Sequence, residues 1–262
     1  MTRIPHSYLQ KEVVVMTAAV PAMTAHANAF RNKVIQGLIL LFTVVGLLVY
    51  APDWLVVTVV AALGGISLIE VITVQVEGDS FMQSDSPKAM LARFYMTVIV
   101  ATGTLAACRL YMSEDGLLTV FYACFVGVMI TDGAAQLTGM FWYRVFGRRT
   151  SMAFGLIRPF KITSPKKTVI GFIGGVLLGG VAVIIVDLVA GGGLPWWFII
   201  AIPVCAEVGD LIASYSKRKI GVKDFAIRTR KPLLGEHGGV LDRGDGHWFT
   251  FMVIGALSFM FL

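Results

Sequence analysis

A charged segment, residues 214–245, carries the side chains best suited to chemistry on phosphates. Apolar runs flank it, from Trp196 to Ala213 and from Trp248 to Leu262. Its cations could offset the charge of a polyphosphate. The basic residues are Lys217, Arg218, Lys219, Lys223, Arg228, Arg230, Lys231 and Arg243, and the acidic residues are Asp224, Glu236, Asp242 and Asp245. A polar segment between two apolar helices is a natural place for chemistry at a membrane surface.

Two features of this segment indicate a metal and a phosphate. Asp242 and Asp245 are three residues apart, so on a helical turn their carboxylates share a face. Mg²⁺ prefers such oxygen ligands together with substrate phosphates. The run His237-Gly238-Gly239 supplies a flexible backbone that can approach a phosphate closely. The alternative is a basic loop that follows the positive-inside rule, with its aspartates paired to neighbouring arginines.

The order of the residues points to a known family. The segment reads S-x-x-K-R-x-x-x-x-K-D and then H-G-G-x-x-D-R-x-D, which resembles the signature of the phosphatidate cytidylyltransferases, also called CDP-diacylglycerol synthases. Upstream blocks resemble the same family, and the resemblance covers about half of the chain, from Asp132 to the end. These blocks are Gly209-Asp210-Leu211, Ser164-Pro165-Lys166-Lys167-Thr168 with Gly171, and Asp132-Gly133-Ala134 through Phe146-Gly147. The chain departs from the pattern in its longer stretch between Asp224 and His237, and in Glu236, where the family has Gly.

The resemblance implies a reaction in which CTP and phosphatidate give CDP-diacylglycerol and diphosphate. A phosphate is already a nucleophile at neutral pH, so catalysis would depend on positioning and on charge stabilisation. The resemblance assigns Mg²⁺ to Asp210, Asp242 and Asp245, and three carboxylates leave room for a second cation. It assigns catalytic contacts to Lys217, Arg218, Lys223, Asp224, His237 and Arg243. It assigns substrate binding to Asp132, Lys166, Lys167, Thr168, Ser214, Gly238 and Gly239.

The composition excludes a soluble enzyme. The chain has 262 residues, of which 56% are hydrophobic and 15% are charged, and its mean hydropathy is +0.78. The net charge of +6 suits an anionic lipid or nucleotide. No aromatic-basic module accompanies it, so nucleic acid is not an expected partner. The three cysteines lie in apolar runs without C-x-x-C spacing, which argues against a zinc site and a disulfide framework.

The hydrophobic pattern predicts an all-α, polytopic integral membrane protein with about seven transmembrane helices. The expected spans are Val34–Tyr50, Trp54–Val74, Met90–Cys108, a fourth with its core at Leu117–Thr131, Val169–Ala190, Trp196–Ala213 and a short Trp248–Leu262. We divide the chain into an N-terminal cytoplasmic or interfacial segment, 1–33, N-terminal transmembrane helices, 34–131, and a catalytic transmembrane region, 132–262, with the signature loop 214–245.

Lysine and arginine predict the orientation. If the N-terminus is cytoplasmic, only Arg109 of the 22 basic residues lies on the opposite side. The active site is then expected to face the cytoplasm, at the inner membrane if the source is bacterial.

Acidic residues in the spans require an explanation, because charge in hydrocarbon is costly. They are Glu70, Asp132, Asp187, Glu207 and Asp210. For Glu70 and Glu207, a helix-end residue that reaches interfacial water and a site residue are both open. We expect Asp132, Asp210, residues 166–168 and the 237–245 turn to meet in one cavity that opens to cytoplasm and membrane, where CTP and the lipid phosphate would react.

Other functions stay open at this point. The same motif could serve another lipid phosphate or a CTP-dependent lipid kinase. A transporter would also show intramembrane carboxylates, but residues 34–131 and 132–262 show no internal repeat. An inactive membrane scaffold is a further alternative. The sequence leaves acyl-chain preference, CTP against dCTP, and the oligomeric state, a homodimer included, undetermined.

Overall fold

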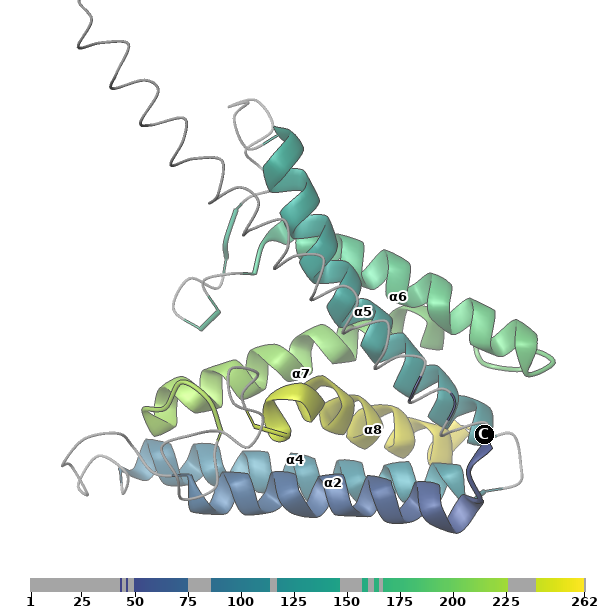
Figure 1. The fold of residues 1–262 in the computed structure, drawn as a ribbon, viewed down its shortest axis with the longest axis horizontal. Coiled ribbons are helices and arrows are strands. Elements are labelled where there is room, and N and C mark those ends of the chain that lie inside the picture. The colour runs from purple at the N-terminus through teal and green to yellow at the C-terminus, as the bar shows by residue number, and fades with distance from the viewer. Residues whose placement is uncertain are drawn as a thin grey trace, which may run out of the picture. The chain divides into compact units, whose positions relative to one another are not determined.

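Six helices build the described part of the chain (Figure 1). The computed structural model describes residues 43, 46, 50–74, 86–113, 117–146, 157–159, 163–164, 167–225 and 239–261. The helices are α2 (Asp53–Thr73), α4 (Pro87–Tyr111), α5 (Leu117–Phe146), α6 (Val169–Val189), α7 (Phe198–Ile220) and α8 (Leu241–Phe261). These ranges contain no strand, and the predicted all-helical class is confirmed for them.

The chain divides into two compact units, Met1–Ala51 and Pro52–Leu262, and all six helices belong to the second. The N-terminal segment 1–33 and nearly all of the first expected span, Val34–Tyr50, lie outside the described residues.

Five of the helices, α2, α4, α5, α6 and α7, are long and apolar enough to cross a membrane. The protein is therefore an integral membrane protein. Helix α8 is not among these five; its first turns carry the charges of the signature. The expected spans at Trp54–Val74, Met90–Cys108 and Val169–Ala190 match α2, α4 and α6 closely.

Three helices extend beyond the apolar spans expected from the sequence, and for α5 this agrees with the helix expected through Phe146. Helix α5 continues past Thr131 to Phe146, α7 continues past Ala213 to Ile220, and α8 begins at Leu241 and not at Trp248. Hydrophobicity underestimates α7 and α8 because their polar ends pair with each other through Lys217 and Asp242. The signature therefore lies largely on helix ends, and the loop that joins them is shorter than predicted.

The helix ends carry clear local signals. Ser86 caps α4 by accepting a hydrogen bond from the Ala89 amide, with Pro87 in the first position. Thr168 caps α6 in the same way, accepting from the Gly171 amide at 3.2 Å. Helix α7 ends at Gly221, whose left-handed φ of 88° suits glycine.

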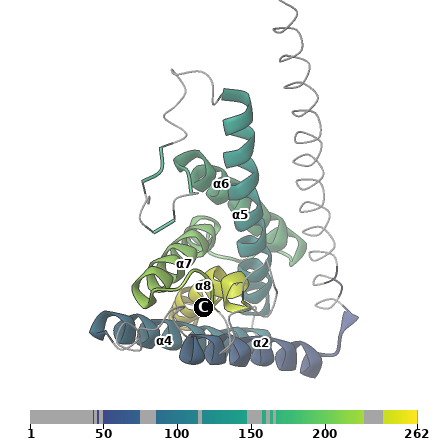
Figure 2. The same cartoon turned by 60° about the vertical axis from the view of Figure 1, so that its left-hand side comes forward.

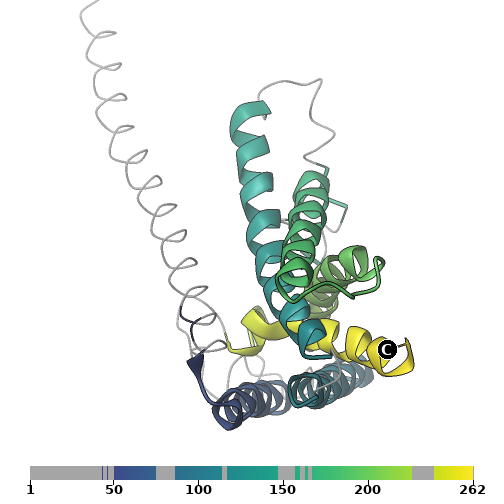
Figure 3. The same cartoon turned by 90° about the vertical axis from the view of Figure 1, so that its right-hand side faces the viewer.

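Small residues allow the helices to approach closely. One face of α6 carries glycines at every fourth position, Gly171, Gly175 and Gly179. This flat face packs against Thr131 and Ala135 of α5. A Cβ at Gly175 would lie 2.9 Å from the Ala135 Cβ and 3.0 Å from the Thr131 carbonyl oxygen. Figure 3 shows the resulting α5–α6 pair side by side.

Helix α8 lies in the middle of this arrangement. It contacts α7 on one side and α4 and α2 on the other, as Figure 2 shows. The backbone of Trp248 packs directly on Gly103 of α4, where a Cβ would collide with it. The first turns of α8 are thus held between the N-terminal helices and α7.

Candidate functional site

The first polar cluster joins the start of α6 to the middle of α7. Lys167 Nζ lies 2.6 Å from Glu207 Oε2 and 2.7 Å from Asp210 Oδ2. Ser214, one turn after Asp210, donates a hydrogen bond to Asp210 Oδ1 at 3.3 Å. Burial alone would lower the pKa of Lys167, but the Asp210 and Glu207 carboxylates outweigh it and raise that pKa above its usual value. The lysine therefore carries a full positive charge.

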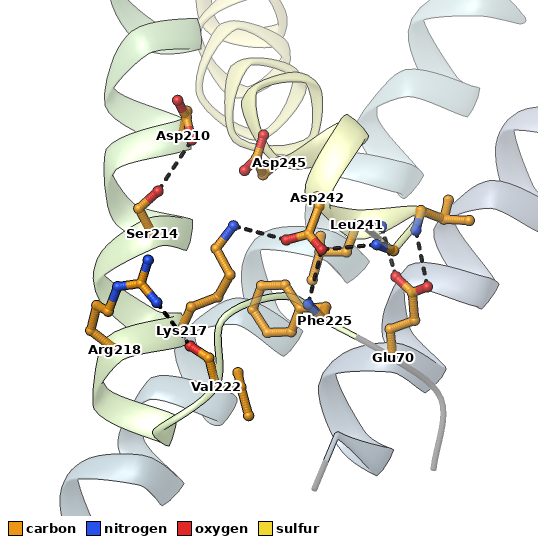
Figure 4. Close-up of polar contacts among 12 residues, drawn as sticks. Glu70, Asp210, Ser214, Lys217, Arg218, Val222, Phe225, Leu241, Asp242 and Asp245 are labelled. Atoms are coloured by element: carbon orange, nitrogen blue, oxygen red, sulfur yellow. Dashed lines mark hydrogen bonds and ion pairs between the residues drawn. The ribbon is translucent and has the colours of Figure 1, made fainter. Parts of the chain in front are cut away.

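The second cluster is centred on Asp242 in the first turn of α8 (Figure 4). Its Oδ1 accepts from Lys217 Nζ at 2.8 Å. Its Oδ2 accepts from the backbone amides of Phe225 and Gly239, both at 2.9 Å. One carboxylate thus ties together the end of α7, the turn that follows it and the start of α8.

Glu70 of α2 supports this turn from the other side. Its Oε1 accepts from the Val240 amide at 2.9 Å and its Oε2 from the Leu241 amide at 2.7 Å. The side chain is completely buried. A carboxylate in this position satisfies amides at a helix N-terminus that have no partner within the helix.

Asp210 of the first cluster and Asp245 of α8, hereafter the acidic pair, lie near each other on the adjacent helices α7 and α8 (Figure 4). Asp245 is 6% exposed and experiences the charges of Asp210, Lys217 and Asp132. The approach depends on glycine, because Gly209 packs against the Asp245 carbonyl oxygen and Gly246. A Cβ on Gly209 would lie 3.1 Å from each.

Asp132 completes the acidic side of the site. Its side chain on α5 is exposed and lies within electrostatic reach of Asp210, Lys167, Glu207 and Arg243. Of the residues predicted to converge, Lys167 contacts Asp210 directly and Asp132 lies within electrostatic reach of both; the cavity that they were predicted to share stays a prediction. The charges of Asp132 and Asp210 also act on Asp245. Asp242 is linked to this group through Lys217, which pairs with Asp242 and lies within electrostatic reach of Asp245.

The donor set suits a hard divalent cation. Carboxylates outnumber cations: Asp132, Glu207, Asp210, Asp242 and Asp245 stand against Lys167, Lys217 and Arg243. The formal excess of two negative charges equals the charge of one Mg²⁺ ion, whose usual ligands are carboxylates with waters and phosphates. Within the described ranges, however, no three His, Cys, Asp or Glu side chains form a ready-made metal site.

The predicted ligand trio does not come together as one group. Both oxygens of Asp242 accept hydrogen bonds from Lys217 and backbone amides. The oxygens of Asp210 are engaged as well, Oδ2 by Lys167 and Oδ1 by Ser214. Asp245 is the member of the trio that, among the described residues, accepts only the adjacent Gly246 amide, and metal ligation by all three stays a prediction.

The remaining predicted residues occupy the edges of the site. Arg218 is exposed and donates to the Val222 carbonyl at 3.2 Å, which supports the turn after α7. Lys223 is exposed in that turn, Asp224 is half-buried, and Arg243 is exposed on α8. Gly239 contributes the amide bound by Asp242, and Thr168 is the α6 cap. Lys166, His237 and Gly238 lie outside the described residues.

Glu70 and Glu207 are the residues whose roles the sequence left open. Interfacial water was one alternative for both, yet Glu70 is 0% and Glu207 1% exposed. Glu207 Oε1 has no hydrogen-bond partner among the described residues. The signal available in the sequence was the cost of a carboxylate inside an apolar helix, which requires a partner; the identity of that partner was not visible.

An apolar groove runs between α5 and α6. Its volume is about 310 Å³, and it is lined by Leu137, Thr138, Phe141, Trp142, Ile170, Ile173, Gly174 and Leu177. Ile170 belongs to the first turn of α6, next to Thr168 and Lys167. The groove therefore begins beside the cationic end of the first polar cluster.

Comparison with known proteins finds a matching family model and several similar sequences. A sequence model described as "Cytidylyltransferase family" matches residues 13–261. A phosphatidate cytidylyltransferase of Bacillus subtilis (strain 168) is 34% identical over 143 residues, which cover 53% of this chain and 46% of the relative. One of Helicobacter pylori (strain J99) is 42% identical over 106 residues, covering 38% of this chain and 35% of the relative. The chain spans at most about half the length of these curated relatives.

Proposed function

Because the chain belongs to the cytidylyltransferase family, we propose that it is a membrane phosphatidate cytidylyltransferase. It would convert CTP and phosphatidate into CDP-diacylglycerol and diphosphate in phospholipid biosynthesis. One observation carries the proposal: α5, the start of α6, α7 and α8 bring Asp132, Lys167, Asp210, Lys217 and Asp245 to one site in a chain of this family.

The reaction joins two anions, so repulsion is its main barrier. An oxygen of the lipid phosphate attacks the α-phosphorus of CTP, a new P–O bond forms, and the bond from the α-phosphorus to the bridging oxygen breaks to release diphosphate. No strong base is required, because the attacking phosphate is already ionised. The site must therefore align the two phosphates and reduce their repulsion.

The chain's own residues divide this task. The acidic pair would hold Mg²⁺, which supplies charge neutralisation and a template for the phosphates. Asp132 provides an additional carboxylate for a second cation. Lys167 and Lys217, both held by carboxylates, place fixed positive charges on two sides of the acidic pair.

Exposed cations would bind the outer phosphates. Lys223, Arg218 and Arg243 are exposed around the same site, and His237 and Lys166 are proposed to contribute further donors. In this proposal Ser214, Gly238 and Gly239 shape the nucleotide side of the site, together with Asp224. CTP would approach from the cytoplasm.

The lipid needs only its phosphate in the polar site. Withdrawing acyl chains from hydrocarbon costs about 0.8 kcal/mol per CH₂, so chains that remain in an apolar groove are strongly favoured. In this proposal the α5–α6 groove receives part of one acyl chain of phosphatidate, because its lining is predominantly apolar and it begins next to Lys167. The phosphate would then lie at the α6 N-terminus, where backbone amides and a lysine favour an anion.

The test uses the purified full-length protein in detergent with CTP, phosphatidate and Mg²⁺. We expect equimolar diphosphate and CDP-diacylglycerol, and no product without Mg²⁺. A CTP-dependent kinase would instead release CDP, and a scaffold or transporter would release neither product. An isoprenoid phosphate offered in place of phosphatidate determines whether another lipid phosphate is preferred; faster turnover with it would replace phosphatidate as the substrate.

A further inference from the structure

We propose that Glu70, in the N-terminal half of the chain, is a positioning residue for cytidylyl transfer. It would hold the first turn of α8, and with it Asp242 and Asp245, at the geometry required for catalysis. The inference rests on the proposed function and assigns a role in it to a residue outside the signature.

The geometry is that of a clamp. The two carboxylate oxygens of Glu70 accept hydrogen bonds from two consecutive amides, Val240 and Leu241, at 2.9 and 2.7 Å. Because Glu70 and Leu241 are completely buried while Val240 is half-buried, water cannot readily replace the carboxylate at the Leu241 amide. Charge-assisted bonds of this kind are short and strong, and a negative charge at a helix N-terminus is favourable.

The turn is shaped to receive this carboxylate. A Cβ at Gly239 would lie 2.7 Å from each oxygen of Glu70, so a larger residue there would displace the carboxylate. Three residues before Glu70, Ser67 Oγ accepts from Trp248 Nε1 at 3.3 Å. Helix α2 thus holds α8 at two levels, at its first turn and about two turns further along.

The clamp acts directly on the candidate metal ligands. The Gly239 amide, adjacent to the clamped Val240, donates to Asp242 Oδ2. Asp242 and Asp245 are one and four residues beyond the clamped Leu241. A shift of these amides therefore moves both carboxylates relative to Lys217 and Asp210. Residues that orient metal ligands through one intermediate group commonly affect activity or metal affinity about 10–100-fold.

The experiment compares three variants of the full-length protein. Glu70→Gln keeps the size of the side chain but replaces one acceptor with a donor that opposes an amide. Glu70→Asp keeps the charge and both acceptors with a shorter reach. Asp187→Asn is the matched control, because Asp187 also accepts from a backbone amide, that of Leu194 at 3.0 Å, at the far end of α6.

Two readouts are combined. Hydrogen exchange of residues 239–245 reports whether the turn loosens, with or without catalysis. Steady-state kinetics against Mg²⁺ concentration reports the effect on the site. For Glu70→Gln we expect faster exchange confined to this turn, kcat at least about 10-fold lower and a higher Mg²⁺ requirement, with partial recovery in Glu70→Asp and no change in Asp187→Asn.

Any other result would contradict the positioning role of Glu70. Unchanged exchange in Glu70→Gln would show that the carboxylate does not hold the turn. Faster exchange with normal kcat and Mg²⁺ requirement would reduce Glu70 to a helix cap without a role in positioning, and general loosening shared by Asp187→Asn would show a purely structural effect. If the unmodified protein forms no CDP-diacylglycerol, the proposed function fails, and positioning for cytidylyl transfer fails with it, while the exchange data still decide whether the clamp exists.

Discussion

At the residue scale, the carboxylates of Asp242 and Asp245 have different surroundings and therefore different expected roles. Asp242 accepts three hydrogen bonds that connect α7, the following turn and α8. Asp245, in contrast, accepts one bond from the adjacent Gly246 amide among the described residues and lies near Asp210. Burial of a carboxylate with so little compensation is costly, and a bound cation would offset that cost.

This difference predicts distinct effects of two isosteric changes. Asp245→Asn is expected to lower kcat by about 100-fold or more and to raise the Mg²⁺ requirement, because it removes one charge from the acidic pair. Its thermal stability in detergent should be equal to or above that of the unmodified protein, since one buried charge is lost. Activity and melting temperature are measured on the same preparations.

Asp242→Asn should behave differently. It leaves Lys217, which is 11% exposed at its side chain, without its charge partner, and breaking a buried pair is strongly destabilising. We therefore expect a lower melting temperature together with lost activity. Equal stability in the two variants would show that Asp242 has no structural task, and normal Mg²⁺ dependence in Asp245→Asn would remove it from the ligand set.

At the element scale, close contact between α7 and α8 creates the acidic pair. Gly209 precedes Asp210 and Gly246 follows Asp245, and these two glycines pack against each other. Because each glycine is next to its aspartate, the separation of the helices sets the separation of the carboxylates.

Gly209→Ala tests this dependence. The new Cβ would lie 2.8 Å from the Phe249 Cβ, so α8 has to move away. We expect kcat to fall at least about 10-fold, because a small misplacement of catalytic groups is costly. Gly65→Ala on α2 is the control, since nothing lies within 4 Å of its Cβ. Normal kcat in Gly209→Ala would refute the role given to this contact.

The α5–α6 groove gives a prediction about the lipid. Leu177→Trp would fill the groove, so the KM for phosphatidate should rise several-fold while the KM for CTP stays unchanged. Leu188→Trp, on the same helix but outside the groove, should have no effect; both leucines are well exposed. The effect should weaken with short-chain phosphatidate, which has fewer methylenes to bury. Equal effects of the two tryptophans would exclude the groove as the acyl-chain site.

At the scale of the whole molecule, orientation decides which substrates can reach the site. The positive-inside rule places the N-terminus and the 214–247 region in the cytoplasm, where CTP is available. With Cys108, Cys124 and Cys205 replaced, a cysteine at the exposed Lys219 should react with an impermeant maleimide only after cells are permeabilised. A cysteine at the exposed Ala190, on the expected outer side, should react in intact cells. The reverse labelling pattern would overturn the orientation and the proposed route of CTP.

Much of this protein could be predicted from the order of its residues. Long apolar runs between charged segments indicated membrane helices, since a bilayer imposes a length and an apolar composition on any helix that crosses it. The ordered signature in residues 214–245, with its S-x-x-K-R, K-D and H-G-G-x-x-D-R-x-D blocks, was specific enough to indicate the family. Both are local properties, which a linear pattern can contain.

Only the tertiary structure decided how the carboxylates are used. Glu70 lies 170 residues from the amide of Val240 that it binds, and Glu207 lies 40 residues from Lys167. Such pairs depend on which helices pack together, and no periodicity in the sequence encodes that choice. The roles of Asp242 and Asp245 were also not visible in the sequence. Their separation of three residues suggested that both bind the metal. Helix α8 packs between α2, α4 and α7, so its side chains meet different elements. Asp242 therefore pairs with Lys217, whereas Asp245 lies near Asp210.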